Sequence, residues 1–167
     1  MALTTDGRSR AGIAYRRVGT GTPILLLHGL PGSSASWLPV ADRLSDQHQL
    51  VIPDLLGFGA SARPTSLSEL HATAQAEAIA ELLTELEMDR LAVVGHDFGG
   101  PVALELSDRH PMLVTHLGVL ATNLFPDTPI PFPLAAATWP LIGRPARGLL
   151  FSRPSLRSSG RKWPASA

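Results

Sequence analysis

The stretch VVGHDFGGPVAL, residues 93–104, decides the fold class of this 167-residue chain. It begins with apolar residues, passes through a glycine-rich turn that holds Asp97, and continues into a pattern typical of a helix. Gly95 and Gly99 lie two residues before and two residues after the aspartate. We interpret the stretch as a strand that turns so abruptly into a helix that a side chain would clash at either glycine. The N-terminus of such a helix offers free N–H groups to an anion.

Strands and helices alternate along the chain on either side of this turn. Apolar runs predict strands over residues 13–18, 24–27, 50–52, 91–94 and 117–121. Helical spacing predicts helices over residues 37–44, after Ser66, and from about Pro101 to Arg109. Strands separated by helices form βαβ units, so the expected fold is α/β, with a parallel-rich, doubly wound sheet.

The helix after Ser66 carries the clearest local signals. Glu69 follows Ser66 by three residues, which predicts a capping box. Apolar residues then recur at helical spacing and predict one buried stripe: Ile79, Leu82, Leu83 and Leu86. Carboxylates recur every four residues on a second face, which we interpret as a solvated surface: Glu77, Glu81 and Glu85.

The composition is that of a globular domain with a hydrophobic core. Hydrophobic residues make up 44% of the chain, and the formal net charge is zero, so nothing global indicates nucleic acid or an anionic membrane. The absence of cysteine excludes disulfides and a cysteine nucleophile. We expect a cytoplasmic protein with no membrane partner, because no apolar stretch is long enough for a leader or a membrane span. No histidine pair has a ligand spacing and no dinucleotide fingerprint occurs, so we expect neither metal nor cofactor.

The composition changes near residue 125. Asp127 is the last acidic residue, and eight prolines lie between Pro126 and Pro164. The basic residues that follow are Arg144, Arg147, Arg153, Arg157, Arg161 and Lys162. This segment has neither interleaved aromatic residues nor a binding motif, so we expect no nucleic-acid partner. We therefore divide the chain into residues 1–125 and residues 126–167.

Residues 12–125 resemble the N-terminal two-thirds of an α/β-hydrolase fold domain. Residues 95–99, GHDFG, resemble the nucleophile elbow of that family, and residues 28–32, HGLPG, resemble its oxyanion loop. Residues 54–64 match the loop that usually follows the next strand. Three motifs in family order make the resemblance specific. It implies an α/β-hydrolase type of sheet for this chain.

The aspartate at the tip of the elbow narrows the resemblance. Most such hydrolases place serine there, whereas aspartate resembles the epoxide hydrolases and the haloalkane and haloacid dehalogenases of this fold. The resemblance implies that Asp97 is a nucleophile that attacks a small hydrophobic substrate and forms an alkyl ester. Water then attacks the ester, and the backbone N–H groups of Leu30 and Phe98 hold the oxyanion. His28 and His96 resemble structural histidines of the family rather than bases.

The substrate class stays open between epoxides and halides. The dehalogenases that the chain resembles commonly hold halide with a tryptophan after the nucleophile and an asparagine after the His-Gly pair. Phe98 and Leu30 occupy these places and have no side-chain donor, which favours an epoxide hydrolase-like protein. The epoxide hydrolases protonate the alkoxide with cap tyrosines, yet Tyr15 is the only tyrosine here. The alternatives are a dehalogenase-like hydrolase and a non-catalytic binding module on the same scaffold.

The other catalytic residues of the family have no counterpart in this chain. Its acid follows a strand after the elbow and its histidine follows the last strand. Here Asn123 is not an acid, Asp127 is the only later carboxylate, and no histidine follows His116. We expect a C-terminally truncated domain without the last strands and most of the cap, and with negligible turnover. Residues 126–167 are then the start of the cap or an aberrant tail.

Such a truncation would leave the predicted strand 117–121 at an edge of the sheet. Its N–H and C=O groups would be unpaired, so we expect self-association through this edge. We also expect marginal stability and mobility after about residue 125.

Overall fold

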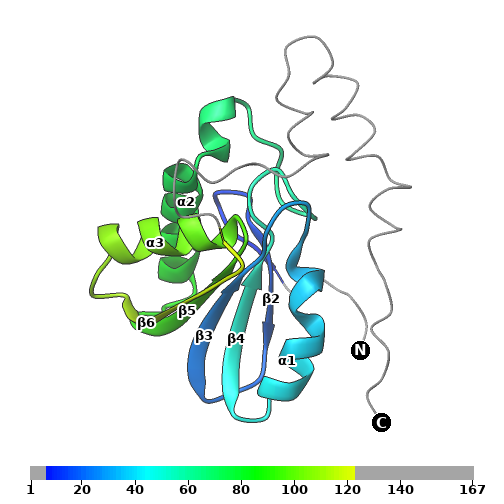
Figure 1. The fold of residues 1–167 in the computed structure, drawn as a ribbon, viewed down its shortest axis with the longest axis vertical. Coiled ribbons are helices and arrows are strands. Elements are labelled where there is room, and N and C mark those ends of the chain that lie inside the picture. The colour runs from blue at the N-terminus through cyan, green and yellow to red at the C-terminus, as the bar shows by residue number, and fades with distance from the viewer. Residues whose placement is uncertain (1–6, 123–167) are drawn as a thin grey trace. The chain divides into compact units, whose positions relative to one another are not determined.

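The computed structural model describes residues 7–122 of the chain (Figure 1). The chain divides into two units, Met1–Leu124 and Phe125–Ala167, and the described residues lie in the first. The segment 126–167, expected to be a cap start or an aberrant tail, lies outside the described residues. Its assignment and its expected mobility stay predictions.

The described residues form one six-stranded sheet with helices between the strands. The strand order is β1-β2-β4-β3-β5-β6. The elements follow one another as β1 Gly7–Arg8, β2 Ala14–Val18, β3 Thr22–Leu27, the 3₁₀ helix η1 Ser34–Trp37, α1 Leu38–Leu44, β4 His48–Pro53, the 3₁₀ helix η2 Leu67–Leu70, α2 Ala72–Glu85, β5 Leu91–His96, α3 Gly99–Arg109 and β6 Val114–Leu120. Strands β4, β3, β5 and β6 pair in parallel, while β1 and β2 are antiparallel. The parallel-rich α/β fold is therefore confirmed.

The central strand β3 is buried on both faces of the sheet. Leu25 and Leu27 pack in a cluster with residues of α2 and α3. Leu26 points to the other face and packs with Trp37 and Ala41, which lie in η1 and α1. Figure 1 shows the same arrangement, with α2 and α3 on one side of the sheet and α1 on the other. A continuous apolar run is what a strand covered on both faces requires.

The helix predicted to open at Ser66 begins differently in the structure. The short η2 comes first, and α2 begins only at Ala72. The Ser66 side chain makes no capping hydrogen bond. The Glu69 carboxylate instead accepts hydrogen bonds from the Thr65 N–H, at 3.2 Å, and from the Thr65 hydroxyl, at 2.6 Å. The predicted capping box was wrong by one residue, because Thr65 offers both a backbone and a side-chain donor.

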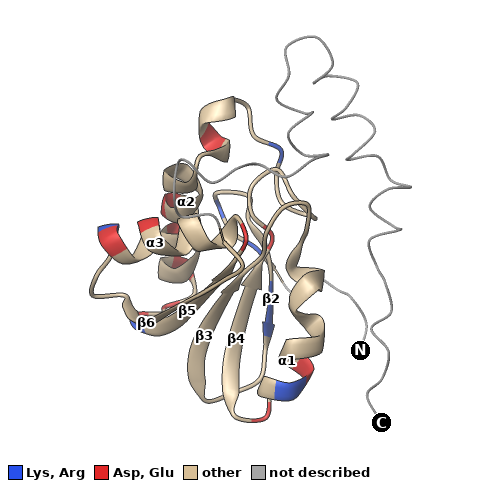
Figure 2. Ribbon diagram, viewed as in Figure 1, with Lys and Arg blue, Asp and Glu red and all other residues tan. Residues whose placement is uncertain are grey.

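The two faces predicted for α2 are present. Ile79, Leu82 and Leu83 are fully buried, and the partly buried Leu86 packs against the same cluster. Figure 2 shows acidic residues gathered along α2 and near the end of α3. Glu81 and Glu85 are exposed, as expected of a solvated face. Glu77 differs, because it pairs with the last turn of α3.

Strand β6 lies at one edge of the sheet formed by residues 7–122. Leu117, Val119 and Leu120 on this strand expose 39%, 38% and 48% of their surface. None of the helices between residues 7 and 122 has the length and apolar character needed to span a bilayer.

Candidate active site

Three loops meet at the carboxyl end of the parallel strands. Residues 28–33 follow β3, residues 54–61 follow β4, and the turn at residues 97–98 joins β5 to α3. A Cβ atom on Gly29 would lie 2.3 Å from the Cβ of Asp97, so the first loop packs directly on the third. Ligands in open parallel sheets bind at this end of the strands.

Asp97 occupies the tip of the turn in a left-handed conformation. Its φ is 50°, which is uncommon for a residue other than glycine and costs on the order of 1 to 3 kcal/mol. A Cβ atom on Gly95 would lie 2.2 Å from the carbonyl oxygen of Gly99. A Cβ atom on Gly99 would lie 2.4 Å from the carbonyl oxygen of Leu27. Both glycines are thus needed for the abrupt turn, as the sequence predicted.

The backbone of Asp97 is hydrogen-bonded by the end of β6, by Thr122 just after it, and by the first turn of α3. The Asp97 N–H donates to the Leu120 carbonyl at 3.0 Å. The Asp97 carbonyl accepts a hydrogen bond from the Gly100 N–H at 3.0 Å and another from the Thr122 hydroxyl at 2.6 Å. These contacts hold the turn in a conformation that the isolated residue would rarely adopt.

The predicted oxyanion donors lie next to the aspartate. The Leu30 N–H donates to Oδ2 of Asp97 at 2.7 Å, a distance typical of a hydrogen bond to a charged acceptor. Phe98 follows Asp97 directly and is the N-cap residue of α3. Within residues 7–122, the Phe98 N–H donates to no other group. The structure therefore brings Asp97, Leu30 and Phe98 together.

His28 is fully buried beneath this site and bridges two loops. Its Nδ1 lies 2.9 Å from the Gly29 carbonyl, and its Nε2 accepts a hydrogen bond from the Leu55 N–H at 3.0 Å. An acceptor at one nitrogen and a donor at the other define a neutral ring protonated on Nδ1. Burial lowers the pKa of His28, which favours the same neutral form. His28 is a structural group here rather than a base.

Asp54 was not singled out from the sequence, yet it organises the second loop. It is buried, and its two carboxylate oxygens accept hydrogen bonds from the Ser34 N–H at 2.6 Å and the Ala60 N–H at 2.7 Å. A Cβ atom on Gly59 would lie 2.1 Å from Oδ2 of Asp54. The signal that could have found this residue is a carboxylate directly after a buried strand, followed by closely spaced glycines.

Gln75 is a second buried residue that sequence reasoning missed. Its amide accepts a hydrogen bond from the Leu56 N–H at 2.8 Å and donates to the Leu56 carbonyl at 3.0 Å. It also donates to the Glu69 carbonyl at 3.1 Å. Gln75 precedes Ile79 by four residues, so it lies on the buried stripe of α2. A polar residue on an apolar stripe was the available signal for this contact.

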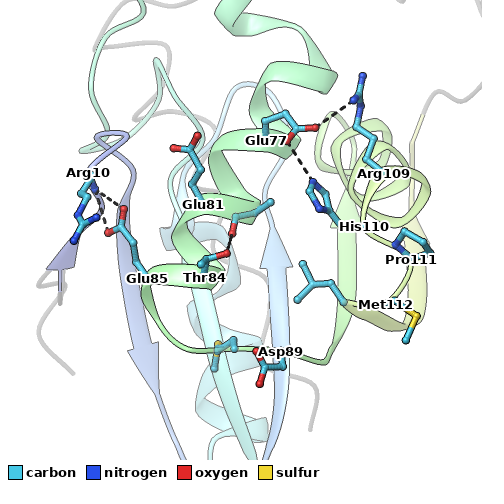
Figure 3. A pocket seen from close by; sticks show the side chains of 13 residues that line it. Arg10, Glu77, Glu81, Thr84, Glu85, Asp89, Arg109, His110, Pro111 and Met112 are labelled. Carbon is cyan, nitrogen blue, oxygen red and sulfur yellow. Dashed lines mark hydrogen bonds and ion pairs between the residues drawn. The ribbon is translucent and has the colours of Figure 1, made fainter.

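An open groove of about 770 Å³ lies elsewhere, along α2 and past the end of α3 (Figure 3). Asp97 is not among its lining residues. Within the groove, Glu77 lies 3.3 Å from both the Arg109 guanidinium and Nε2 of His110. Glu85 accepts from the Arg10 N–H at 3.0 Å. These contacts join α2 to its neighbours. No cluster of metal-ligating side chains occurs in this groove or elsewhere between residues 7 and 122.

Comparison with known proteins supports one family. Residues 22–162 match the family described as alpha/beta hydrolase fold. The chain is 36% identical over 106 residues to a soluble epoxide hydrolase of Corynebacterium. This match covers 64% of this chain and 36% of that protein. It is 41% identical over 105 residues to haloalkane dehalogenase 2 of Mycobacterium tuberculosis. This match covers 60% of this chain and 36% of that protein.

Comparison with solved structures also finds an epoxide hydrolase. The epoxide hydrolase CorEH, determined without ligand, superposes with a TM-score of 0.66 and 32% sequence identity. The match covers 75% of this chain and 45% of CorEH. The chain thus spans less than half the length of each of these relatives.

Proposed function

Because the chain belongs to the alpha/beta hydrolase fold family, with relatives that include an epoxide hydrolase and a haloalkane dehalogenase, we propose that Asp97 is a nucleophile toward small hydrophobic epoxides. One observation carries this proposal. The Asp97 carboxylate stands on a strained turn with φ of 50°, and the Leu30 N–H lies 2.7 Å from Oδ2. Strain of this kind persists only where surrounding contacts enforce it, and it clusters at functional sites.

In the proposed reaction the two carboxylate oxygens have different tasks. Oδ2 accepts the Leu30 N–H, so Oδ1 is the oxygen that attacks an epoxide carbon. The carbon–oxygen bond of the ring breaks, the alkoxide takes a proton from solvent, and a hydroxyalkyl ester of Asp97 forms. Water then adds to the ester carbonyl, and the negative charge develops on Oδ2. The Leu30 and Phe98 N–H groups stabilise this charge before the diol leaves and the carboxylate is restored.

Epoxides are favoured over halides by the side chains beside Asp97. Leu30 and Phe98 are both apolar, so neither donates a hydrogen bond to a departing halide. A haloalkane substrate is the second candidate, and the 41% identity to a haloalkane dehalogenase supports it.

Ester hydrolysis by this chain is expected to be slow. His28 uses both ring nitrogens on backbone groups, and no histidine follows His116 in the 167 residues. The second step needs a base that activates water, and loss of such a base costs about 10⁴-fold or more in rate. We therefore propose that the chain accumulates the alkyl ester.

Intact mass spectrometry tests this proposal. Incubation with styrene oxide and with 1-bromobutane should give one equivalent of adduct from the epoxide, and peptide mapping should place it on Asp97. Asp97→Asn should abolish the adduct, because an amide is a poor nucleophile, while asparagine tolerates a positive φ and keeps the turn. Asp89→Asn, an exposed carboxylate elsewhere, is the matched control and should react normally.

Other outcomes discriminate between the alternatives. An adduct from bromobutane alone would show a dehalogenase-like nucleophile. No adduct from either reagent, with protein that unfolds cooperatively in urea, would contradict the proposal and support a binding module on this scaffold.

A further inference from the structure

We propose that Thr122 is a positioning residue that aims the Phe98 N–H at the oxyanion site. Thr122 lies just beyond β6, and its hydroxyl donates to the carbonyl oxygen of Asp97 at 2.6 Å. Hydroxyl hydrogen bonds of this length lie at the short end of the usual range. The inference rests on the proposed role of Asp97, and it assigns a task to a residue outside all three sequence motifs.

The argument depends on the peptide group between Asp97 and Phe98. This group is planar and trans, so the Asp97 carbonyl and the Phe98 N–H point in opposite directions. Any contact that fixes the carbonyl therefore fixes the N–H as well. The Thr122 hydroxyl and the Gly100 N–H both donate to this carbonyl, at 2.6 and 3.0 Å, so the Phe98 N–H points to the opposite side. A hydrogen bond to the carbonyl also polarises the peptide and strengthens its N–H as a donor.

The Phe98 N–H is available for this task. Within residues 7–122 it donates to no protein group, whereas the Leu30 N–H already contacts Oδ2 of Asp97. Two converging donors are needed to stabilise an oxyanion effectively. Thr122 thus controls the second donor without touching the reacting atoms itself.

Gly100 supplies an independent observation. A Cβ atom at this position would lie 2.2 Å from the Thr122 hydroxyl oxygen and 2.6 Å from its Cβ. Threonine is β-branched and stiff, so it could not move aside without losing its hydrogen bond. Glycine in a helix is about 1 kcal/mol less favourable than alanine. Gly100 is therefore unfavourable for the helix but leaves the space that the Thr122 side chain occupies.

A spectroscopic experiment tests the orientation of the peptide directly. Thr122→Val removes the hydroxyl and keeps the shape, while Thr122→Ser keeps the hydroxyl. The backbone ¹⁵N and ¹H shifts of Phe98 should change in the valine variant and stay close to wild type in the serine variant. Thr115→Val, at an exposed threonine on β6, is the matched control and should leave Phe98 unchanged. Identical Phe98 shifts in wild type and Thr122→Val would overturn the inference.

A kinetic experiment tests the consequence for the oxyanion. The styrene oxide adduct is isolated and then hydrolysed at raised pH, where hydroxide adds to the Asp97 ester without a histidine. Loss of one oxyanion donor costs about 10²- to 10³-fold, so a misdirected donor in Thr122→Val should slow hydrolysis about 10- to 100-fold. Adduct formation should change less than about 2-fold, since no oxyanion develops in that step. Thr122→Ser should restore hydrolysis.

Gly100→Ala gives a second route to the same effect. Its methyl group would displace the Thr122 hydroxyl, so ester hydrolysis should fall as in Thr122→Val although alanine favours the helix. Hydrolysis at the wild-type rate in both variants would overturn the inference. If wild type forms no adduct, the proposed function fails instead, and the Phe98 shifts alone decide whether Thr122 sets the peptide.

Discussion

Asp97 shows how a single strained residue is held by hydrogen bonds from both near and distant parts of the chain. Its N–H, carbonyl and carboxylate are each hydrogen-bonded, by Leu120, by Thr122 with Gly100, and by Leu30. A hydrogen bond contributes on the order of 1 kcal/mol net, so these contacts together offset the cost of the left-handed backbone. The carboxylate is then presented to the loop of Leu30 in one orientation.

His28 gives a prediction about pH at the same scale. Its folded pKa is lowered from the ordinary value of 6.5, mainly by burial. Above that value the ring is neutral in both states. Below pH 6.5, His28 binds a proton in the unfolded chain but stays neutral in the folded chain. The free energy of unfolding therefore falls as the pH drops from about 6.5 toward the folded pKa. The slope contributed by one such group is at most about 1.4 kcal/mol per pH unit.

Urea unfolding between pH 7.5 and 5.5 measures this slope. His28→Gln should unfold more easily at every pH but lose the part of the slope that His28 contributes. His71→Gln, an exposed histidine, should keep the wild-type slope. If the free energy of unfolding of His28→Gln changes with pH as steeply as that of wild type, His28 does not contribute to the pH dependence.

Sequence reasoning found some site residues and missed others for a physical reason. Asp97 and Leu30 belong to local motifs, in which neighbours along the chain reveal the turn. Asp54, Gln75 and Thr122 each also contact a backbone group about 20 residues away or more, and a local pattern does not reveal these partners. Only the folded sheet brings these partners together.

The start of α2 gives a prediction at the scale of one element. Ser66 makes no capping hydrogen bond, whereas Glu69 accepts two hydrogen bonds from Thr65. Ser66→Ala should therefore change the free energy of unfolding by less than about 0.5 kcal/mol. Glu69→Ala should cost more than Ser66→Ala, since it removes the carboxylate that accepts hydrogen bonds from both the N–H and the hydroxyl of Thr65. Denaturant unfolding of the two variants checks this order, and a larger loss in Ser66→Ala would restore the original capping box.

Element boundaries were the part of the fold that the sequence predicted least well. The strand before the elbow was expected at residues 91–94 and extends to His96. The helix after Ser66 was expected as one piece but is split into η2 and α2. Pairing with Leu120 on β6 extends β5 to His96, and the extended backbone of His71 separates η2 from α2. Periodicity shows only which face is buried.

At the scale of the whole molecule, the fold class was predicted correctly because hydrophobic pattern and turn chemistry agree along the chain. The alternation of buried runs with amphipathic helices leaves few arrangements other than a parallel sheet. Strand β2 was expected at residues 13–18, but its antiparallel direction was not. Strand β1 was not predicted, since a two-residue strand has no detectable period.

The edge strand β6 leads to a prediction about association, which stays a proposal. Leu117, Val119 and Leu120 expose apolar surface on a strand that is an edge among the described residues. Unpaired strand edges pair with other chains unless charge blocks them. Sedimentation velocity of the full chain should show dimers or larger species, and Val119→Lys should shift the population toward monomer. Leu67→Lys, at a leucine that is 80% exposed on η2, should have no effect. A monomeric wild-type chain would contradict this proposal.

The central place of β3 in the sheet has a consequence for the order of folding. β3 pairs with β4 and also with β5, where Ile24 lies opposite Ala92. Bringing these two strands together closes the long loop between Ile24 and Ala92, and this costs conformational entropy before the strand contacts stabilise the sheet. Folds with many contacts between residues distant in sequence therefore form slowly. Leu30 lies in the loop after β3 and Asp97 directly follows β5, so these two residues can meet only after β3 and β5 have paired. The rate at which Asp97 becomes reactive toward an epoxide during refolding would then report when the sheet is complete.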